Sequence, residues 1–384
     1  SCPGIKCSEF NDCFFYTSRR AASEADILVV NHHLLFADLA LRADTAEYSQ
    51  TAVIPACKIF ILDEAHNLEE TATKHFGFRT TSVGVQRALN KIYQKRGRRE
   101  HGTLASLYSM ISFGRGEFSV EDRAALLQDI SEEMIPSRLE IGDISRSLFD
   151  VVTTFITDPT KAQYGEYRLR IGPKEEKRGE FSTLVHFAFK LRDECKRLAA
   201  KMRKIARKIG NLLGEEGDEE SECFELPLTE LNSYASRLDE IAGGVNILFD
   251  TGAADREIFV HFFTAAFRKN AVYTAFHSLP IEVSKPMLEY CFKKIPSTIL
   301  VSGTMTTAHD FSFIRNRLGL NSDELVPAPI EGRFPSPFNY QEQARLFIPT
   351  DIPDPASAIF AEKVSEPLFE IILASQGGAL ILCT

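Results

Sequence analysis

The chain has 384 residues, of which 44% are hydrophobic and 25% are charged. This length suits two or three domains of about 150 residues, each with a real hydrophobic core. No apolar run approaches the roughly 18 residues that cross a membrane, and the polar first residues are not those of a secretory signal. We therefore expect a cytoplasmic protein, a monomer with no membrane partner.

The net charge of −9 argues against a nucleic-acid partner, but the charge is unevenly distributed. Residues 190–208 hold nine Lys or Arg against two acids, residues 215–222 hold six acids, and a second basic stretch runs from Arg87 to Arg99. Local patches decide whether a surface can neutralise phosphates. For any single lysine of 190–208, a solvated helix face balanced by the acidic residues is an equally good interpretation.

Eight cysteines are too few for a disulfide framework, which indicates a reducing compartment. Cys2, Cys7 and Cys13 have the spacing C-x4-C-x5-C and look like metal ligands that lack a fourth partner. Structural zinc sites usually pair cysteines more closely, so the wide gap favours an iron–sulfur cluster. Zinc and chance clustering remain alternatives. The scattered cysteines are predicted to be buried free thiols: Cys57, Cys195, Cys223, Cys291 and Cys383.

Four short apolar runs are typical of buried parallel strands, which are continuous rather than alternating. They span residues 26–30, 58–62, 297–301 and 379–383. The first three end in the polar clusters Asn-His-His, Asp-Glu-Ala-His and Ser-Gly-Thr. Because ligands bind at the carboxyl ends of such strands, the pattern predicts an α/β fold with a ligand site at that edge of the sheet.

A long segment between the second and third strands has helical periodicity instead. Apolar residues recur at alternating steps of four and three from Leu191 to Leu212, and again from Leu228 to Phe249. These two stripes, joined by the acidic residues, predict an antiparallel helical hairpin. The bulk of Thr80–Ala265 is therefore predicted to be a mainly helical domain inserted into the α/β domain.

The last residues predict the start of another sheet. Residues 332–355 are rich in proline and are predicted to form a loop with one short strand. A helix is predicted over 358–375, ended by Gly377 and Gly378, and a strand over 379–383. Because nothing follows that strand to cover it, we expect the chain to be a fragment.

The sequence KIFILDEAHNLEE carries the strongest chemical signal. A buried strand delivers Asp63 and Glu64 to its end, where the first can hold Mg²⁺ and the second can polarise an attacking water. Ser302 and Thr304 follow the third strand, where their hydroxyls can bond to the acid–His pair and sense phosphates. The plain alternatives are a charged turn and an ordinary helix cap. No G-x-x-x-x-G-K-[ST] phosphate loop occurs in the sequence, so the chain either is no ATPase or relies on a loop upstream.

These motifs, in this order, carry a resemblance. Three clustered cysteines are followed by VVNHHLL, ILDEAHNLEE, a long helical insertion, HSLPIEVS, ILVSGTM, SPFNYQEQ and GGALILCT. The set resembles the DinG/XPD group of superfamily 2 DNA helicases, and more closely its bacterial DinG branch, over essentially the whole chain. The triplet Ser-Gly-Thr departs slightly from the usual Ser-Ala-Thr.

The resemblance implies a RecA-like parallel-sheet motor domain with a large helical Arch insertion and the start of a second RecA-like domain. By it, residues 1–20 are a remnant of an iron–sulfur domain, residues 21–79 and 266–322 are motor domain 1, residues 80–265 are the Arch, and residues 323–384 begin motor domain 2. Cys2, Cys7 and Cys13 would be three of four ligands to a [4Fe–4S] cluster, whose fourth ligand lies upstream.

The resemblance also implies a DNA repair or replication helicase that hydrolyses ATP with Mg²⁺, moves 5′ to 3′ on single-stranded DNA and unwinds forked duplex DNA. Asp63 and Glu64 would be the Mg²⁺ and catalytic-base residues, and His66 would couple the nucleotide to the rest of the motor. Ser302 and Thr304 would link hydrolysis to strand movement. Without a phosphate loop the chain alone is expected to be inactive. The alternatives are a non-catalytic nucleic-acid-binding or scaffold protein and a thiol-based redox or metal sensor.

Overall fold

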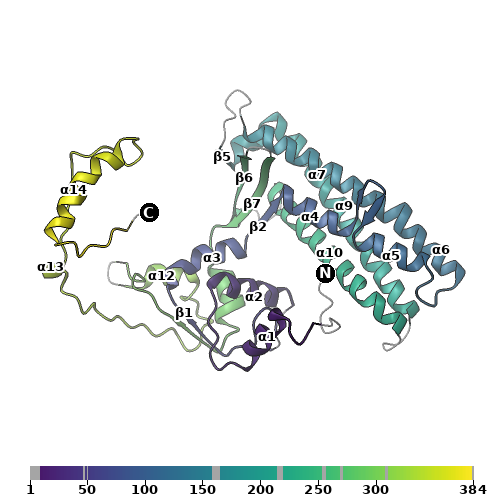
Figure 1. Cartoon of the computed structure of the whole chain (residues 1–384), viewed down its shortest axis with the longest axis horizontal. Helices are drawn as coiled ribbons and strands as arrows, with labels where there is room; N and C mark the ends of the chain where they lie inside the picture. The colour runs from purple at the N-terminus through teal and green to yellow at the C-terminus, as the bar shows by residue number, and fades with distance from the viewer. Residues whose placement is uncertain are drawn as a thin grey trace. The chain divides into compact units, whose positions relative to one another are not determined.

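Figure 1 shows a computed structural model of the chain, which describes residues 9–45, 48–49, 51–157, 165–213, 219–252, 257–268, 271–307 and 310–382. The contacts divide the chain into two units, residues 1–329 and residues 330–384, and each is described here by itself. The larger unit is a mixed α/β structure with a parallel strand pair, an antiparallel sheet and many helices.

Two of the predicted strands form and pair in parallel. They are β1 (Ile59–Leu62) and β8 (Ser297–Leu300), and their register runs from Ile59 opposite Ser297 to Leu62 opposite Leu300. The predictions of strands at 58–62 and 297–301 are therefore confirmed, but the prediction that they are buried is wrong, because Ile59 and Ile61 are 60% and 68% exposed. The pairing also brings the ends of both strands to one edge, as the sequence predicted.

The strand predicted over residues 26–30 is wrong. This segment begins with a bend at residues 26 and 27, and it forms no strand ladder with any residue that the structure describes. Ile27 and Val29 are 84% and 91% exposed. A continuous apolar run is only a strand when a neighbouring strand accepts its hydrogen bonds, and here β1 and β8 pair with each other instead. The segment connects α1 (Phe14–Glu24) to α2 (His32–Thr45).

A buried ion pair on α2 anchors the segment that leads into β1. Arg42 and Asp38 are joined by an Nε–Oδ2 distance of 2.6 Å, and both side chains are almost fully buried. Asp38 Oδ1 accepts from the backbone N–H groups of Val53 and Ile54 at 2.7 and 2.9 Å. The Arg42 guanidinium donates to the carbonyls of Tyr48 and Ile54. The buried Asp38 carboxylate and the buried Arg42 guanidinium therefore both have hydrogen-bond partners in addition to each other.

A four-stranded antiparallel sheet, which the mainly helical prediction missed, crosses both predicted ends of the insertion at residues 80 and 265. Its strand order is β2 (Phe78–Thr81), β7 (Ala271–Pro280), β6 (Phe259–Arg268) and β5 (Gly165–Ile171). Only two residues separate β6 from β7 in the sequence, a spacing typical of a hairpin. Phe263 and Phe276 pair across β6 and β7 and enter the helical core, so one face of the sheet is covered by helices.

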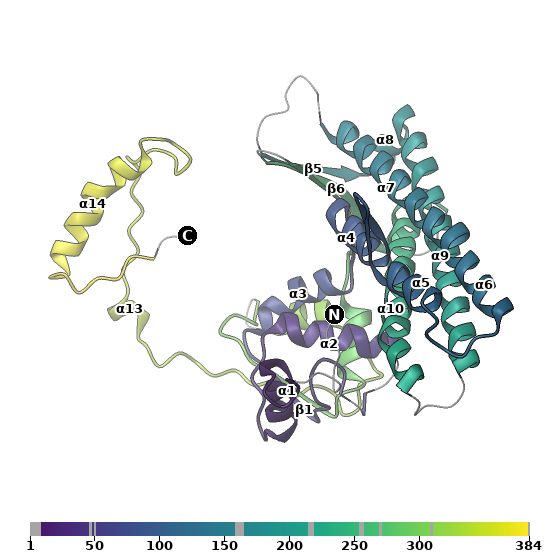
Figure 2. The same ribbon diagram turned by 45° about the vertical axis from the view of Figure 1, so that its right-hand side comes forward.

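The predicted helical hairpin is confirmed. Helices α9 (Gly179–Leu213) and α10 (Glu219–Phe249) lie side by side in both views (Figures 1 and 2). Their facing apolar stripes are buried, with Leu198, Met202 and Leu238 fully inaccessible. Helix α7 (Ile135–Ile156) packs against α9.

Shorter elements complete the larger unit. Around the hairpin lie α4 (Ser82–Ile92), β3 (Gln94–Arg96), β4 (Arg99–His101), α5 (Thr103–Ser112), α6 (Val120–Gln128), the π-helical turn η3 (Asp129–Met134) and α8 (Pro173–Glu176). Around β1 and β8 lie the 3-10 turn η2 (Ala65–Asn67), α3 (Leu68–His75), α11 (Ser284–Met287), the π-helical turn η5 (Leu288–Phe292) and α12 (Ser312–Leu318). Each group surrounds an apolar core of its own.

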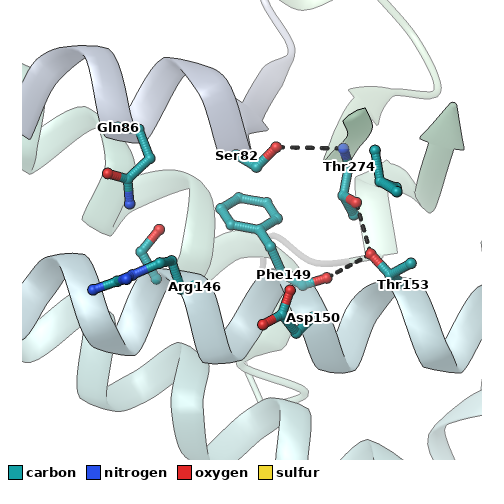
Figure 3. A pocket seen from close by; sticks show the side chains of 9 residues that line it. Ser82, Gln86, Arg146, Phe149, Asp150, Thr153 and Thr274 are labelled. Atoms are coloured by element: carbon teal, nitrogen blue, oxygen red, sulfur yellow. Dashed lines mark hydrogen bonds between the residues drawn. The ribbon is translucent and has the colours of Figure 1, made fainter. Parts of the chain in front are cut away.

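Polar side chains join the antiparallel sheet to the helices. Figure 3 shows Thr153 of α7 and Thr274 of β7, whose hydroxyl oxygens are 2.8 Å apart. The backbone N–H of Thr274 also lies 3.4 Å from Ser82 Oγ at the start of α4. One β7 residue therefore contacts two helices across a pocket of about 110 Å³.

The C-terminal unit contains α13 (Tyr340–Gln343) and α14 (Phe360–Ala374), and the helix predicted over 358–375 is confirmed. Gln376 and Gly377 follow α14 with φ of 57° and 80°. The short strand predicted within 332–355 is wrong, and so is the strand predicted over 379–383 as far as residue 382, because residue 383 lies outside the described residues. Leu380 and Leu382 are each 86% exposed, because within this unit no strand lies beside them to pair with. Nowhere in the described parts of the chain is a helix both long enough and apolar enough to cross a membrane.

Two ion pairs with the same spacing and the same distance allow a test of the α2 anchor. Asp38→Asn should lower the free energy of unfolding by about 3 kcal/mol, because it leaves the Arg42 charge buried without its counter-charge. Glu70→Gln removes the exposed Glu70–Lys74 pair, which is also an i,i+4 pair at 2.6 Å, and should lower the free energy of unfolding far less, because water screens the pair. Urea unfolding measures both. Equal losses would show that burial does not set the strength of the anchor.

Candidate active site

The ends of β1 and β8 place the predicted site residues at one edge of the parallel pair. Asp63 and Glu64 follow β1 directly, and Ser302 comes two residues after β8. The turn after β1 is tied to its neighbour, because the backbone N–H of Ala65 donates to the Val301 carbonyl at 3.0 Å. Two segments more than 200 residues apart therefore form one site.

Glu64 has an uncommon backbone conformation. Its φ of 48° and ψ of 47° are left-handed, which costs a non-glycine residue about 1 kcal/mol. The turn is held by Asp63 Oδ1, which accepts from the Glu64 N–H at 2.9 Å, and by the Glu64 carbonyl, which accepts from the Asn67 N–H at 2.9 Å. Such strain is characteristic of functional sites, where it aims a side chain.

His66 joins the two strand ends. Its Nδ1 lies 2.8 Å from Ser302 Oγ and 3.2 Å from Glu64 Oε2. Ser302 Oγ also accepts from the backbone N–H of Thr304 at 3.2 Å. The predicted bond between a hydroxyl after the third strand and the acid–His pair is therefore present. Because a lone pair on Nδ1 would face a carboxylate, the tautomer with a proton on Nδ1 is favoured.

The carboxylates of this site are open to solvent. Asp63 and Glu64 are exposed, and the side chains of Glu64 and His66 are 61% and 41% accessible. Carboxylate oxygens in such a position are the ligands that Mg²⁺ prefers when it arrives with a phosphate substrate. The residues present therefore fit a magnesium-bound nucleotide approaching the carboxyl ends of the strands.

Comparison with known proteins adds independent support. Residues 5–84 match the family model DEAD_2. The whole chain is 24% identical to the ATP-dependent DNA helicase YoaA of Haemophilus influenzae, of which it covers 48%. It is 25% identical over 88% of its length to a Bacillus subtilis protein named 3′-5′ exonuclease DinG, covering 33% of it. For the ATP-dependent DNA helicase DinG of Salmonella choleraesuis the identity is 22%, over 91% of the chain and 44% of the relative.

The resemblance to DinG-type helicases is confirmed. The matched residues 5–84 include the turn with Asp63, Glu64 and His66. The chain spans about half the length of the helicases named YoaA and DinG that it matches.

The cysteines of the DinG-type pattern are only partly described. Cys2 and Cys7 lie outside the described residues, and Cys13 is a half-buried free thiol immediately before α1. Over the residues with described positions, no group of three or more His, Cys, Asp or Glu is arranged to hold a metal. A thiol at the surface is available as a ligand, and the Cys13 thiol fits that requirement.

The prediction of buried thiols is confirmed for two of the four scattered cysteines that the structure describes. Cys195 and Cys291 are buried free thiols, and burial raises the pKa of each to about 12, so they stay protonated at neutral pH. Cys57 and Cys223 are only half-buried, and Cys383 lies outside the described residues.

The histidines after the first predicted strand do not cap a strand. Asn31 Oδ1 instead accepts from the Leu34 N–H at 2.8 Å and caps helix α2. His33 Nδ1 lies 3.2 Å from His75 Nε2 on α3. Desolvation, and secondly the charge of His33, lowers the pKa of His75. A neutral His75 ring can accept a hydrogen bond from His33.

Most cations of the basic stretch 190–208 are used within the protein. Lys190 and Lys201 pair with Glu140 and Glu133 at 3.0 Å, and Arg203 pairs with Asp239 at 2.6 Å. Arg192 and Arg197 bond to acids on α9 itself. Among the described residues, the cations without an ion pair on this stretch are Lys196, Lys204, Arg207 and Lys208. Counting lysines and arginines along the sequence therefore overestimates how much positive charge helix α9 has available for a ligand.

The arginines and rings of the antiparallel sheet were not among the predicted site residues. Arg168 and Arg170 on β5 and Phe262 on β6 line an open hollow beside α3. The period-2 alternation of charged and apolar residues in GEYRLRI was a usable signal, because it is typical of a half-exposed strand.

The geometry of His66 predicts its protonation. In the neutral ring the proton should lie on Nδ1, because that nitrogen faces the Glu64 carboxylate. Long-range proton–nitrogen correlation spectra distinguish the two tautomers. Glu64→Leu should shift the ring toward the Nε2–H form, and Ser302→Ala should not, while the exposed His101 serves as an internal reference. An Nε2–H ring in the unsubstituted chain would show that the carboxylate does not set the tautomer.

Proposed function

We propose that the chain supplies the ATP-hydrolysing core of a DinG-type DNA helicase, which moves 5′ to 3′ on single-stranded DNA and unwinds forked duplexes. The observation that carries the proposal is the hydrogen bond between His66 and Ser302, 2.8 Å long. It connects the acid-bearing end of β1 to the hydroxyl-bearing end of β8. A structural turn after a strand needs no such connection, whereas an enzyme that converts hydrolysis into movement does.

Each site residue has a role that its surroundings support. Asp63 would hold the Mg²⁺ that accompanies ATP, and the exposed Glu64 would accept a proton from the attacking water. His66 contacts Glu64 on one side and Ser302 on the other, so a change at the nucleotide reaches β8. Thr304 is tied to Ser302 through its backbone N–H and would move with it.

Hydrolysis requires a phosphate-binding element in addition to these residues. The sequence contains no G-x-x-x-x-G-K-[ST] loop, and the matched helicases named YoaA and DinG are about twice as long as this chain. We therefore assign turnover to a longer polypeptide that joins this segment to a phosphate loop. The chain of 384 residues by itself is expected to release no phosphate from ATP.

The proposal extends to the architecture. The parallel pair β1–β8 would belong to a RecA-like motor domain made of residues 21–79 and 266–322, and residues 80–265 would be the Arch. The support is that the hairpin α9–α10 lies between β1 and β8 in the chain. The antiparallel sheet continues past residue 265 through β6 and β7, so it would lie at the base of the Arch. Residues 323–384 would begin the second motor domain.

An iron–sulfur cluster is part of the same proposal. Cys2, Cys7 and Cys13 would supply three thiolates, and the fourth would come from the longer polypeptide. When bound, such a cluster would cross-link residues 1–20 and so brace the segment before α1. This chain's own contribution is to present Cys13 at the surface immediately before α1.

Substitution of the proposed base tests the ATPase assignment. In the longer polypeptide, Glu64→Gln should reduce DNA-stimulated phosphate release by about 100-fold or more while nucleotide binding is kept, because the amide cannot accept the proton. Glu240→Gln, an exposed change on α10, is the matched control. Unchanged hydrolysis in Glu64→Gln would remove this residue from the base role. No hydrolysis in the unsubstituted polypeptide would favour the non-catalytic scaffold.

Visible absorbance tests whether an iron–sulfur cluster is bound. The longer polypeptide should show the broad visible absorbance of an iron–sulfur cluster, and Cys13→Ser should abolish or strongly reduce it by removing one ligand. Cys57→Ser changes a half-buried thiol elsewhere and should leave the spectrum intact. A colourless polypeptide with full DNA-stimulated hydrolysis would contradict the cluster.

A further inference from the structure

The face of the antiparallel sheet opposite the helices carries arginines and aromatic rings. Side chains alternate between faces along a strand, so Phe263 and Phe276 enter the helical core while Phe262 and His277 lie on the other face. The register places Arg170 opposite Phe262 and Arg79 opposite His277. One row of side chains therefore crosses all four strands of the sheet, with an arginine at each end.

Planar groups are layered on this face. The guanidinium carbon of Arg168 lies 3.9 Å from the centroid of the Phe262 ring. The Phe262 and His277 rings are parallel to within 7°, with centroids 4.4 Å apart. Phe262 is only 6% exposed, whereas Arg168 is exposed, so the guanidinium presents a flat surface to solvent. A guanidinium held on a ring in this way is oriented before any ligand arrives.

Positive charge on this face belongs to the arginines alone. Desolvation, followed by the charges of Arg79 and Arg168, lowers the pKa of His277 to about 4, so its ring is neutral at physiological pH. In the part of the chain that the structure describes, Arg79, Arg168 and Arg170 form no ion pair. Nearby cations differ, since Arg317 pairs with Glu69 and Lys74 with Glu70. These three arginines therefore have charge available for an anionic ligand.

Two of these arginines, Arg168 and Arg170, line a groove that leads towards the candidate active site. Arg168, Arg170 and Phe262 line a hollow of about 610 Å³, bounded on the far side by Glu69 and Thr73 of α3. A second hollow of about 350 Å³ shares Glu69 and Thr73 and ends at His66. The groove thus follows α3 from the sheet to the histidine that contacts Ser302.

We propose that the sheet face bearing Arg79, Arg168, Arg170 and Phe262 binds single-stranded nucleic acid, with phosphates at the arginines and a base stacked on the Arg168 guanidinium. The inference rests on the proposed function, and it assigns a contact surface to residues that carry no helicase motif. Duplex DNA does not present free base faces, and an acidic polypeptide has no bases to stack. Cations beside a planar platform are the combination that single strands select.

Binding of a labelled oligo(dT) to the chain of 384 residues, measured by fluorescence anisotropy at several salt concentrations, tests the proposal. Arg168→Gln with Arg170→Gln should weaken binding about tenfold or more at low salt. The slope of log affinity against log salt should fall by about 1.4, since each single-strand phosphate contact contributes about 0.7. The control Arg146→Gln with Arg237→Gln removes the same charge from exposed positions on α7 and α10 and should bind as the unsubstituted chain does.

Arg168→Lys separates stacking from charge. Lysine keeps the positive charge but not the plane, so affinity for oligo(dT) should fall about tenfold while the salt slope is kept. Affinity for an abasic strand of equal length should not change, because that strand has no base to stack. All these arginines are exposed, and thermal melting confirms that each variant is folded.

Three outcomes would overturn the proposal. The first is oligo(dT) binding by Arg168→Gln with Arg170→Gln that equals the control, which would leave the ATPase assignment intact. The second is a preference for poly-glutamate over oligo(dT), which would assign the face to an acidic polypeptide. The third is that the unsubstituted chain binds neither oligo(dT) nor the abasic strand. Glu64→Gln in the longer polypeptide tests the ATPase separately, so failure of this surface and failure of the proposed function are distinguishable.

Discussion

The parallel pairing of β1 with β8 is the constraint on which the rest of the structure depends. Ile59 and Ser297 are register partners, so everything between them must leave the pair and return to it. Closing so long a loop has an entropic cost, which grows only slowly with length and is offset by the cores that form on both sides. Because the strands run in parallel, their carboxyl ends coincide, and a hydrogen bond between His66 and Ser302 becomes possible. A register shift would separate these side chains.

Local strain and buried charge are both held by this framework. The left-handed backbone of Glu64 persists because the neighbouring Ala65 is bonded to Val301 beyond β8. The Asp38–Arg42 network fixes the entry to β1, and it avoids the penalty of buried charge by using backbone groups as partners. The position of the candidate catalytic carboxylates therefore follows from hydrogen bonds that lie outside the motif itself.

The distribution of free positive charge is also a tertiary property. Helix α9 is the most basic stretch of the sequence, yet several of its cations are neutralised by α7, by α10 and by acids on α9 itself. Strand β5 looks unremarkable by charge count, but Arg168 and Arg170 line an open groove and pair with no acid among the described residues, since Glu69 in that groove pairs with Arg317. A nucleic-acid surface in this fold is therefore found by asking which cations lack partners, not which segment holds most of them.

The sequence by itself determined the two parallel strands, the helical hairpin and helix 358–375, because each of these depends on local periodicity. It also determined that Asp63, Glu64, His66 and Ser302 form one site, because these residues follow the two strands directly. It did not determine whether residues 26–30 or 379–382 pair, because an apolar run forms a strand only when another strand lies beside it. The antiparallel sheet and its stacked Arg168, Phe262 and His277 were likewise decided by the tertiary structure alone. Arg168 comes from β5, far from β6 and β7 in the sequence, and only the register of the folded sheet makes it a neighbour of Phe262.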